Sequence, residues 1–105
     1  MIVISDTSAI TNLAGIQHLQ LLCQLYNQVT IPEAVYRELV EIYPPVPGTL
    51  EVQTAPWLEV RQVSNRQAIE RLQLDVRLDL GESEAIALAL ELNADLLLKK
   101  STFLN

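Results

Sequence analysis

The sequence has little of the chemistry that most readily marks a binding site. Its 105 residues include one cysteine, Cys23, and one histidine, His18, which excludes a disulfide framework and a metal site built from these residue types. Basic residues are also scarce, with seven against thirteen acidic ones and a formal net charge of −6. Nucleic-acid binders usually carry a basic patch. This balance disfavours a tight, metal-free binder but allows an enzyme that holds phosphate through bound cations.

Long apolar runs are missing too. No run approaches the ~20 residues that cross a bilayer, and residues 1–5 lack the charged and hydrophobic segments of a secretory signal. We therefore expect a soluble, cytoplasmic protein without membrane contact. Half of the residues are nevertheless hydrophobic. That fraction is enough for a folded core, and the length suits one domain over residues 1–105.

Short apolar runs alternate with helical patterns along the chain. The unbroken apolar run at residues 2–4 predicts a strand buried on both faces, as in a parallel sheet. Proline and glycine at residues 43–49 predict a loop. Further strands are predicted at residues 29–31, 58–63 and 96–98, and helices at residues 9–14, 17–26, 33–42, 65–72 and 82–93. The pattern predicts an α/β sandwich with a mainly parallel central sheet flanked by helices.

Asp6 ends the first predicted strand and precedes the first helix. In open parallel α/β sheets, binding sites form beyond the carboxyl ends of the strands, so Asp6 stands where a functional acid is expected. It could instead be the N-cap of the following helix. Ser8 could also provide that cap and leave Asp6 for other work, so both interpretations remain open.

Glu38 lies inside the apolar stripe of the helix predicted at residues 33–42. It follows Ala34 by four positions and Val35 by three, which places it on their face. A carboxylate drawn towards a core needs a partner, because burying an unpaired charge is costly. Since Arg37 faces away, a bound cation is an attractive partner. The alternative is a boundary glutamate that reaches solvent or pairs with a distant arginine.

Two acids, Glu82 and Glu84, open the helix predicted at residues 82–93. They could simply offset the helix dipole, and Asp79 with Glu82 has the spacing of a capping box. Helical geometry assigns Glu82 to the face of the packed alanines and isoleucine and Glu84 to a more exposed face. We therefore expect Glu82 to point inward. Carboxylates gathered at one sheet edge repel one another unless a hard cation binds, and Mg²⁺ or Mn²⁺ prefers such ligands.

Four blocks of the sequence together resemble the PIN-domain family. Residues 1–8 (MIVISDTS) resemble its opening, a hydrophobic strand followed by Asp-x-Ser/Thr. Residues 31–39 (IPEAVYREL) are similar to the second motif, whose glutamate corresponds to Glu38. Residues 78–89 (LDLGESEAIALA) resemble the third motif, and residues 93–98 (NADLLL) resemble the strand before the fourth. The blocks have the right spacing, span nearly the whole chain and look most like the VapC-like members.

The resemblance implies a metal-dependent ribonuclease, often the toxin of a toxin–antitoxin pair, usually dimeric and inhibited by a small antitoxin protein. Carried over position by position, Asp6, Glu38 and Glu82 would be catalytic residues that bind Mg²⁺ or Mn²⁺. Glu84 would be a metal ligand that replaces or supplements Glu82. Such carboxylate-held ions can activate water and polarise a phosphodiester.

The resemblance also implies roles for residues near the RNA substrate, and the end of the chain departs from the family pattern. Thr7 and Ser8 would steady the site by hydrogen bonding. Relatives continue the last strand into an acidic pair and then another helix and strand, whereas this chain has Lys99 and Lys100 and stops at Asn105. We therefore expect a truncated PIN-like domain whose last elements are missing. Its Mg²⁺ binding should be weaker, because lysine is positive and accepts no hydrogen bond, and its lysines could contact RNA phosphate.

Three functions remain open on the sequence. The first is an active, Mg²⁺-dependent endoribonuclease. The second is a catalytically inactive remnant that acts as an oligomeric or antitoxin-binding module. The third is a helical interaction module whose acids are only caps and surface charges. Missing elements would expose sheet edge or core surface, which favours a homo-oligomer.

Overall fold

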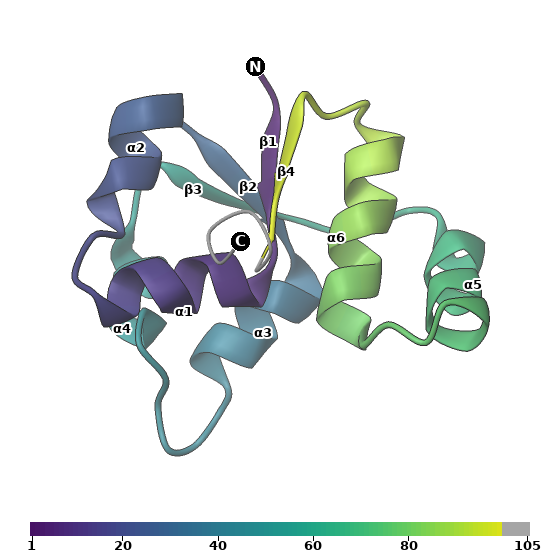
Figure 1. Ribbon diagram of the computed structural model, residues 1–105, viewed down its shortest axis with the longest axis horizontal. Helices are drawn as coiled ribbons and strands as arrows, with labels where there is room; N and C mark the ends of the chain where they lie inside the picture. Colours follow the sequence, from purple (N-terminus) through teal and green to yellow (C-terminus); the bar gives the residue numbers. More distant parts are fainter. Residues whose placement is uncertain (100–105) are drawn as a thin grey trace.

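The computed structural model describes residues 1–99, which form an α/β fold around a four-stranded sheet (Figure 1). Its strands are β1 (Val3–Ser5), β2 (Val29–Pro32), β3 (Leu58–Arg61) and β4 (Leu96–Leu98). The order across the sheet is β3-β2-β1-β4, and each neighbouring pair is parallel. Because the strands run the same way, their carboxyl ends meet at one edge of the sheet.

Six helices flank this sheet within residues 1–99. They are α1 (Thr7–Gly15), α2 (Gln20–Tyr26), α3 (Glu33–Val40), α4 (Thr49–Thr54), α5 (Arg66–Asp75) and α6 (Leu80–Glu91). The predicted α/β sandwich with a parallel central sheet is confirmed. None of these helices is long and apolar enough to cross a membrane.

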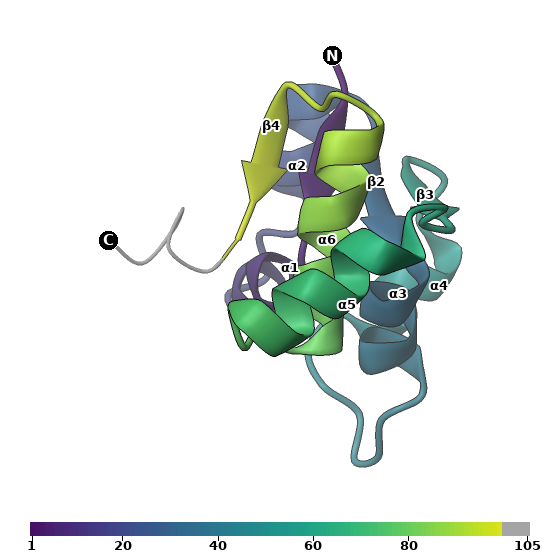
Figure 2. The ribbon, with the colours of Figure 1, turned by 90° about the vertical axis from the view of Figure 1, so that its right-hand side faces the viewer.

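The helices form a layer on each face of the sheet. In Figure 1, α1, α2 and α4 lie on one side and α5 and α6 on the other; Figure 2 shows α5 and α6 in front of the sheet with α2 behind it. Successive side chains of β1 point to opposite faces of the sheet and pack against different helix layers. Val3 packs into the core with α1 and α2, and Ile4 packs into the core with α5 and α6. This alternation is the period of two expected of a strand.

The sequence pattern does not predict α4. This helix has six residues, buries only Val52 and follows Gly48, which offers no side-chain cap. A helix this short shows no clear 3.6-residue repeat. Its position depends on packing against α3.

Helix α6 begins at Leu80, two residues before the predicted start. Asp79 is its N-cap, because its Oδ1 accepts a hydrogen bond from the backbone N–H of Glu82 at 2.8 Å. Of the two hydrogen bonds of the predicted capping box, the one accepted by the Asp79 side chain is therefore confirmed. The earlier start also places Gly81 inside the first helical turn.

Two leucines of α6 provide a test of this packing. Leu88 is fully buried in the core shared with Ile4, whereas Leu90 is 72% exposed on the same helix. We expect Leu88→Ala to lower the free energy of unfolding by ~2–5 kcal/mol. Leu90→Ala should change it by no more than about 0.5 kcal/mol. Urea unfolding of both variants checks this, and equal losses would contradict the observed orientation of α6.

Candidate functional site

Asp6 lies directly after β1 and is buried, with 4% of its surface exposed. Its backbone N–H donates to the carbonyl oxygen of Leu98 at 3.0 Å, which holds it beside the end of β4. Its Oδ1 accepts from the backbone N–H of Ala9 at 2.9 Å, so Asp6 is the N-cap of α1. The alternative that Ser8 caps this helix is wrong. A cap does not exclude a second role, because a carboxylate has two oxygens and about four lone-pair sites.

Glu38, in α3, is half-buried and reaches the first turn of α1. Thr7 donates a hydrogen bond from its Oγ1 to Oε2 of Glu38 at 2.8 Å, and the backbone N–H of Gly81 donates another. Burial raises the pKa of Glu38 above its ordinary value of 4.5. The negative charges of Asp79 and Asp6 add to this rise, whereas the two hydrogen bonds oppose it.

Gly81 is a site residue that the sequence analysis did not identify. A Cβ at this position would overlap both carboxylate oxygens of Glu38. Glycine therefore allows Glu38 to lie directly against the backbone of α6. The available signal was a glycine in front of a strong helical pattern, which is equally typical of a simple helix boundary.

Glu82 and Glu84 have the opposite exposure to the predicted one. Glu84 is buried, with 4% of its surface exposed, and Glu82 is exposed. Oε1 of Glu84 accepts from the backbone N–H of Ala34 at 3.0 Å, and its Oε2 lies 4.0 Å from Nη1 of Arg66. The prediction was wrong because α6 packs against α3 and α5 as well as the sheet. A single apolar stripe does not show which polar face a second helix covers.

Glu82 nevertheless lies in the electrostatic neighbourhood of the other acids. Partial burial raises the pKa of Glu82 above 4.5, and the charges of Asp79 and Asp6 raise it further. Lys99 lowers the pKa of Glu82, because its positive charge favours the ionised carboxylate. Asp79 is therefore a fourth acid, besides Asp6, Glu38 and Glu82, whose charge contributes to the electrostatics at this edge of the sheet.

Two hollows flank these acids. One of about 250 Å³ is lined by charged Asp6, Glu82 and Lys99 and by apolar residues, among them Val76, Leu78, Ile86 and Leu97. The other, of about 530 Å³, is lined by Thr7, Glu38, Thr11, Asn12, Ile42, Val46 and Pro47. The acids therefore have solvent-accessible space on two sides.

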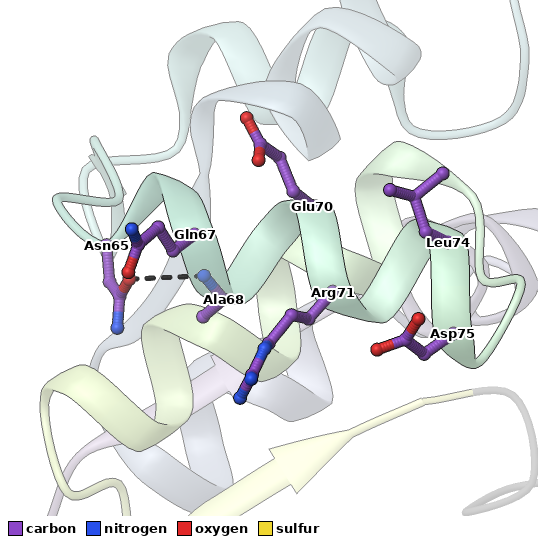
Figure 3. Close-up of a pocket in the computed structure, with 7 residues that line it drawn as sticks. All are labelled: Asn65, Gln67, Ala68, Glu70, Arg71, Leu74 and Asp75. Atoms are coloured by element: carbon purple, nitrogen blue, oxygen red, sulfur yellow. Dashed lines mark hydrogen bonds between the residues drawn. The ribbon is translucent and has the colours of Figure 1, made fainter.

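A further hollow of about 520 Å³ lies on the outer surface of α5 (Figure 3). Its lining comes from this helix and its N-cap, Asn65. The hydrogen bond drawn there, from the backbone N–H of Ala68 to Oδ1 of Asn65 at 3.1 Å, is the helix cap. The position of Asn65 in this hollow is thus explained by its role as the helix cap.

The donor atoms at the sheet edge have the chemistry of a hard-cation site. Asp6, Glu38 and Glu82 offer carboxylate oxygens, and the charge of Asp6 raises the pKa of both glutamates. Within residues 1–99, no three Asp, Glu, His or Cys side chains are close enough to hold one ion directly. Lys99 lines the hollow beside Asp6 and Glu82. Lys100 lies outside the described residues.

The raised pKa of Glu38 predicts a pH-dependent stability difference. A raised pKa means that the ionised carboxylate is less favourable in the folded chain than in the unfolded one. The ionised group therefore lowers the free energy of unfolding above the folded pKa and has no such effect well below 4.5. We expect Glu38→Gln to raise the free energy of unfolding at neutral pH in buffer with a chelator. This gain should shrink as the pH falls. Urea unfolding from about pH 4 to about pH 8 measures it.

The exposed Glu41, at the end of α3, provides the matched control for that experiment. Glu41→Gln makes the same chemical change and should give no comparable gain. A gain for Glu38→Gln that grows towards acidic pH would contradict the assigned direction of the pKa.

Comparison with known proteins identifies the family. A family model described as PIN domain matches residues 2–100. No curated protein and no solved structure matches the chain. PIN domains are typically nucleases and generally use divalent metal ions. Because the match covers almost the whole chain, and the parallel sheet carries acids at its carboxyl edge, this protein belongs to the PIN-domain family.

Proposed function

We propose that this protein is a metal-dependent endoribonuclease in which Asp6, Glu38 and Glu82 are the catalytic carboxylates. One observation carries the proposal. Acids from three separated segments lie together at the sheet edge. Asp6 and Glu82 line one hollow, Glu38 lies directly against Gly81 beside Glu82, and the charge of Asp6 raises the pKa of both glutamates. Perturbed carboxyl groups beside open hollows are typical of functional sites. A group of acids that repel one another is best compensated by a bound cation.

Mg²⁺ or Mn²⁺ is the proposed cofactor, held by Asp6, Glu38 and Glu82. Glu84, the further ligand that the resemblance implies, is left out of this set because its two oxygens already face the N–H of Ala34 and the guanidinium of Arg66. Mg²⁺ usually keeps several waters and binds one or two carboxylates directly, so three side chains need not converge on it. When bound, such an ion supplies an activated water and a charge that polarises the phosphodiester. Thr7 keeps the Glu38 carboxylate in place through its 2.8 Å hydrogen bond.

The proposed RNA-binding groups lie around these acids. Ser8 is half-buried in the first turn of α1, next to Thr7. Lys99 is exposed and lines the hollow beside Asp6, where its ammonium can pair with a backbone phosphate. Lys100 follows it in the sequence and is proposed for the same role.

The biological setting is proposed from the family resemblance. The protein would act in the cytoplasm as the toxin of a toxin–antitoxin pair and would be inhibited by a small antitoxin protein. A homo-oligomer is also proposed.

RNA cleavage tests the proposed activity. Purified protein is expected to cut RNA with Mg²⁺ or Mn²⁺ and to stop when a chelator is added. Asp6→Asn and Glu38→Gln should each lower the rate by more than about 100-fold, the upper range for losing a residue that merely supports a metal site. Glu41→Gln should leave the rate unchanged. No cleavage with either ion, or full cleavage by Asp6→Asn, would refute the proposal.

A second candidate is a catalytically inactive PIN module that binds partners. The position of Lys99 favours it. Lys99 lines the hollow with Asp6, and its positive charge already lowers the pKa of Glu82. An ammonium in this place competes with a metal ion for the same carboxylates. In that case the wild-type chain would bind divalent metal weakly and cut no RNA.

Charge reversal at Lys99 separates the two candidates. Lys99→Asp should tighten Mn²⁺ binding by about tenfold or more, an effect of ~1.4 kcal/mol, measured by calorimetric titration. Arg71→Asp, on the outer face of α5 (Figure 3), makes the same charge change at another place and should not alter the affinity. Cleavage that appears only in Lys99→Asp would favour the inactive module. Equal affinity in both variants would show that Lys99 does not oppose metal binding.

A further inference from the structure

Glu84 is a buried carboxylate that the proposed catalytic set does not use. Only 4% of its surface is exposed, and acids are rarely so buried unless they are paired. Oε1 accepts a 3.0 Å hydrogen bond from the backbone N–H of Ala34, and Oε2 lies 4.0 Å from the guanidinium of Arg66. Both oxygens are therefore directed at groups of other helices.

The hydrogen bond to Ala34 meets a local need of α3. The first N–H groups of a helix have no partner within the helix, and the N-cap residue here, Pro32, offers no side-chain acceptor. Glu84 supplies that acceptor from α6. A negative charge at this end also interacts favourably with the helix dipole. Glu84 thus caps a helix that its own sequence leaves uncapped.

The same two helices are joined by a second contact of the same kind. Glu38, four residues after Ala34 in α3, lies so close to Gly81 in α6 that a Cβ there would overlap its carboxylate, and the backbone N–H of Gly81 stabilises its ionised form. Each helix therefore gives a carboxylate to a first-turn N–H of the other. We call this pair of contacts, Glu84 with Ala34 and Glu38 with Gly81, the reciprocal clamp. One of its two carboxylates is a proposed catalytic residue and the other is not.

We propose that Glu84 is a positioning residue that fixes the start of α3 on α6 and thereby holds the Glu38 carboxylate at the site. The inference rests on the proposed nuclease function for its consequence in catalysis, but not for its structural content. Without Glu84, the start of α3 loses its acceptor and is free to shift on α6. The contact of Glu38 with Gly81 and its 2.8 Å hydrogen bond from Thr7 both depend on that placement.

Glu91 provides a matched control within the same helix. It lies seven residues after Glu84, and its Oε1 accepts from the backbone N–H groups of Ser64 and Asn65 at 2.9 and 3.1 Å. These groups precede α5, which carries none of the proposed catalytic acids. Glu91 thus performs the same anchoring chemistry away from the catalytic set. Its loss should affect stability without displacing Glu38.

The experiment compares Glu84→Ala, Glu84→Gln and Glu91→Ala in the full chain. Glu84→Ala is expected to weaken Mn²⁺ binding and RNA cleavage by about 10–100-fold, the range for residues that support a metal site. Glu91→Ala should remain close to wild type in both. Glu84→Gln keeps an oxygen acceptor for Ala34 and should recover most of the loss. If Glu84→Ala does not fold, Glu84→Asp, with the same charge on a shorter side chain, takes its place.

Amide hydrogen exchange without metal separates this inference from the nuclease proposal. Loss of Glu84 should speed exchange at Ala34 and at Gly81, whereas loss of Glu91 should speed it at Ser64 and Asn65. If wild-type protein neither binds Mn²⁺ nor cuts RNA, the nuclease proposal fails, but faster exchange at Gly81 still supports positioning. Unchanged exchange at Gly81 in Glu84→Ala would overturn it. If the wild-type chain binds Mn²⁺, equal Mn²⁺ affinity in Glu84→Ala and Glu91→Ala would also overturn it.

Discussion

Where helices α3 and α6 meet, a carboxylate of each helix faces a backbone N–H in the first turn of the other. Glu84 accepts from the N–H of Ala34, and Glu38 accepts from the N–H of Gly81. First-turn N–H groups lack partners within their own helix and sit at its positive end, so a carboxylate is well suited to them. This contact determines where α3 lies at the end of the sheet. The meeting of Glu38 with Thr7, at the start of α1, depends on it.

The negative charges gathered at the site oppose this arrangement of helices electrostatically. Negative charges on Asp6 and Asp79 raise the pKa of Glu38 and Glu82, so folding places these two glutamates where their ionised forms are less favourable. The hydrogen bonds to Glu38 and the positive charge of Lys99 offset part of that cost. The two apolar cores on either side of the sheet stabilise the remainder of the fold. Unfavourable charge held in place by a stable scaffold is a common property of functional sites.

Much of the scaffold could be predicted because its signals are local. The apolar run at residues 2–4 overlaps β1 at residues 3 and 4, and the run at residues 96–98 matches β4. Asp6 and Asp79 have the residue type and position of helix caps, and both make the cap hydrogen bond. Glu38 falls in an apolar stripe and is half-buried. The short α4 has no comparable local signal, because six residues do not establish a helical repeat.

The sequence by itself determined the succession of strands and helices along the chain except α4, the parallel character of the sheet and the segments that carry the acids, because hydrophobic period and capping chemistry act over a few residues. Only the tertiary structure decided which acid of α6 is buried. Glu84 faces the start of α3 and Glu82 faces solvent, contrary to the pattern, because a second helix covers a face that a single stripe does not reveal. The role of Gly81 was decided in the same way. A Cβ there would overlap the carboxylate of Glu38, which is distant in the sequence and becomes a neighbour only when α3 and α6 pack.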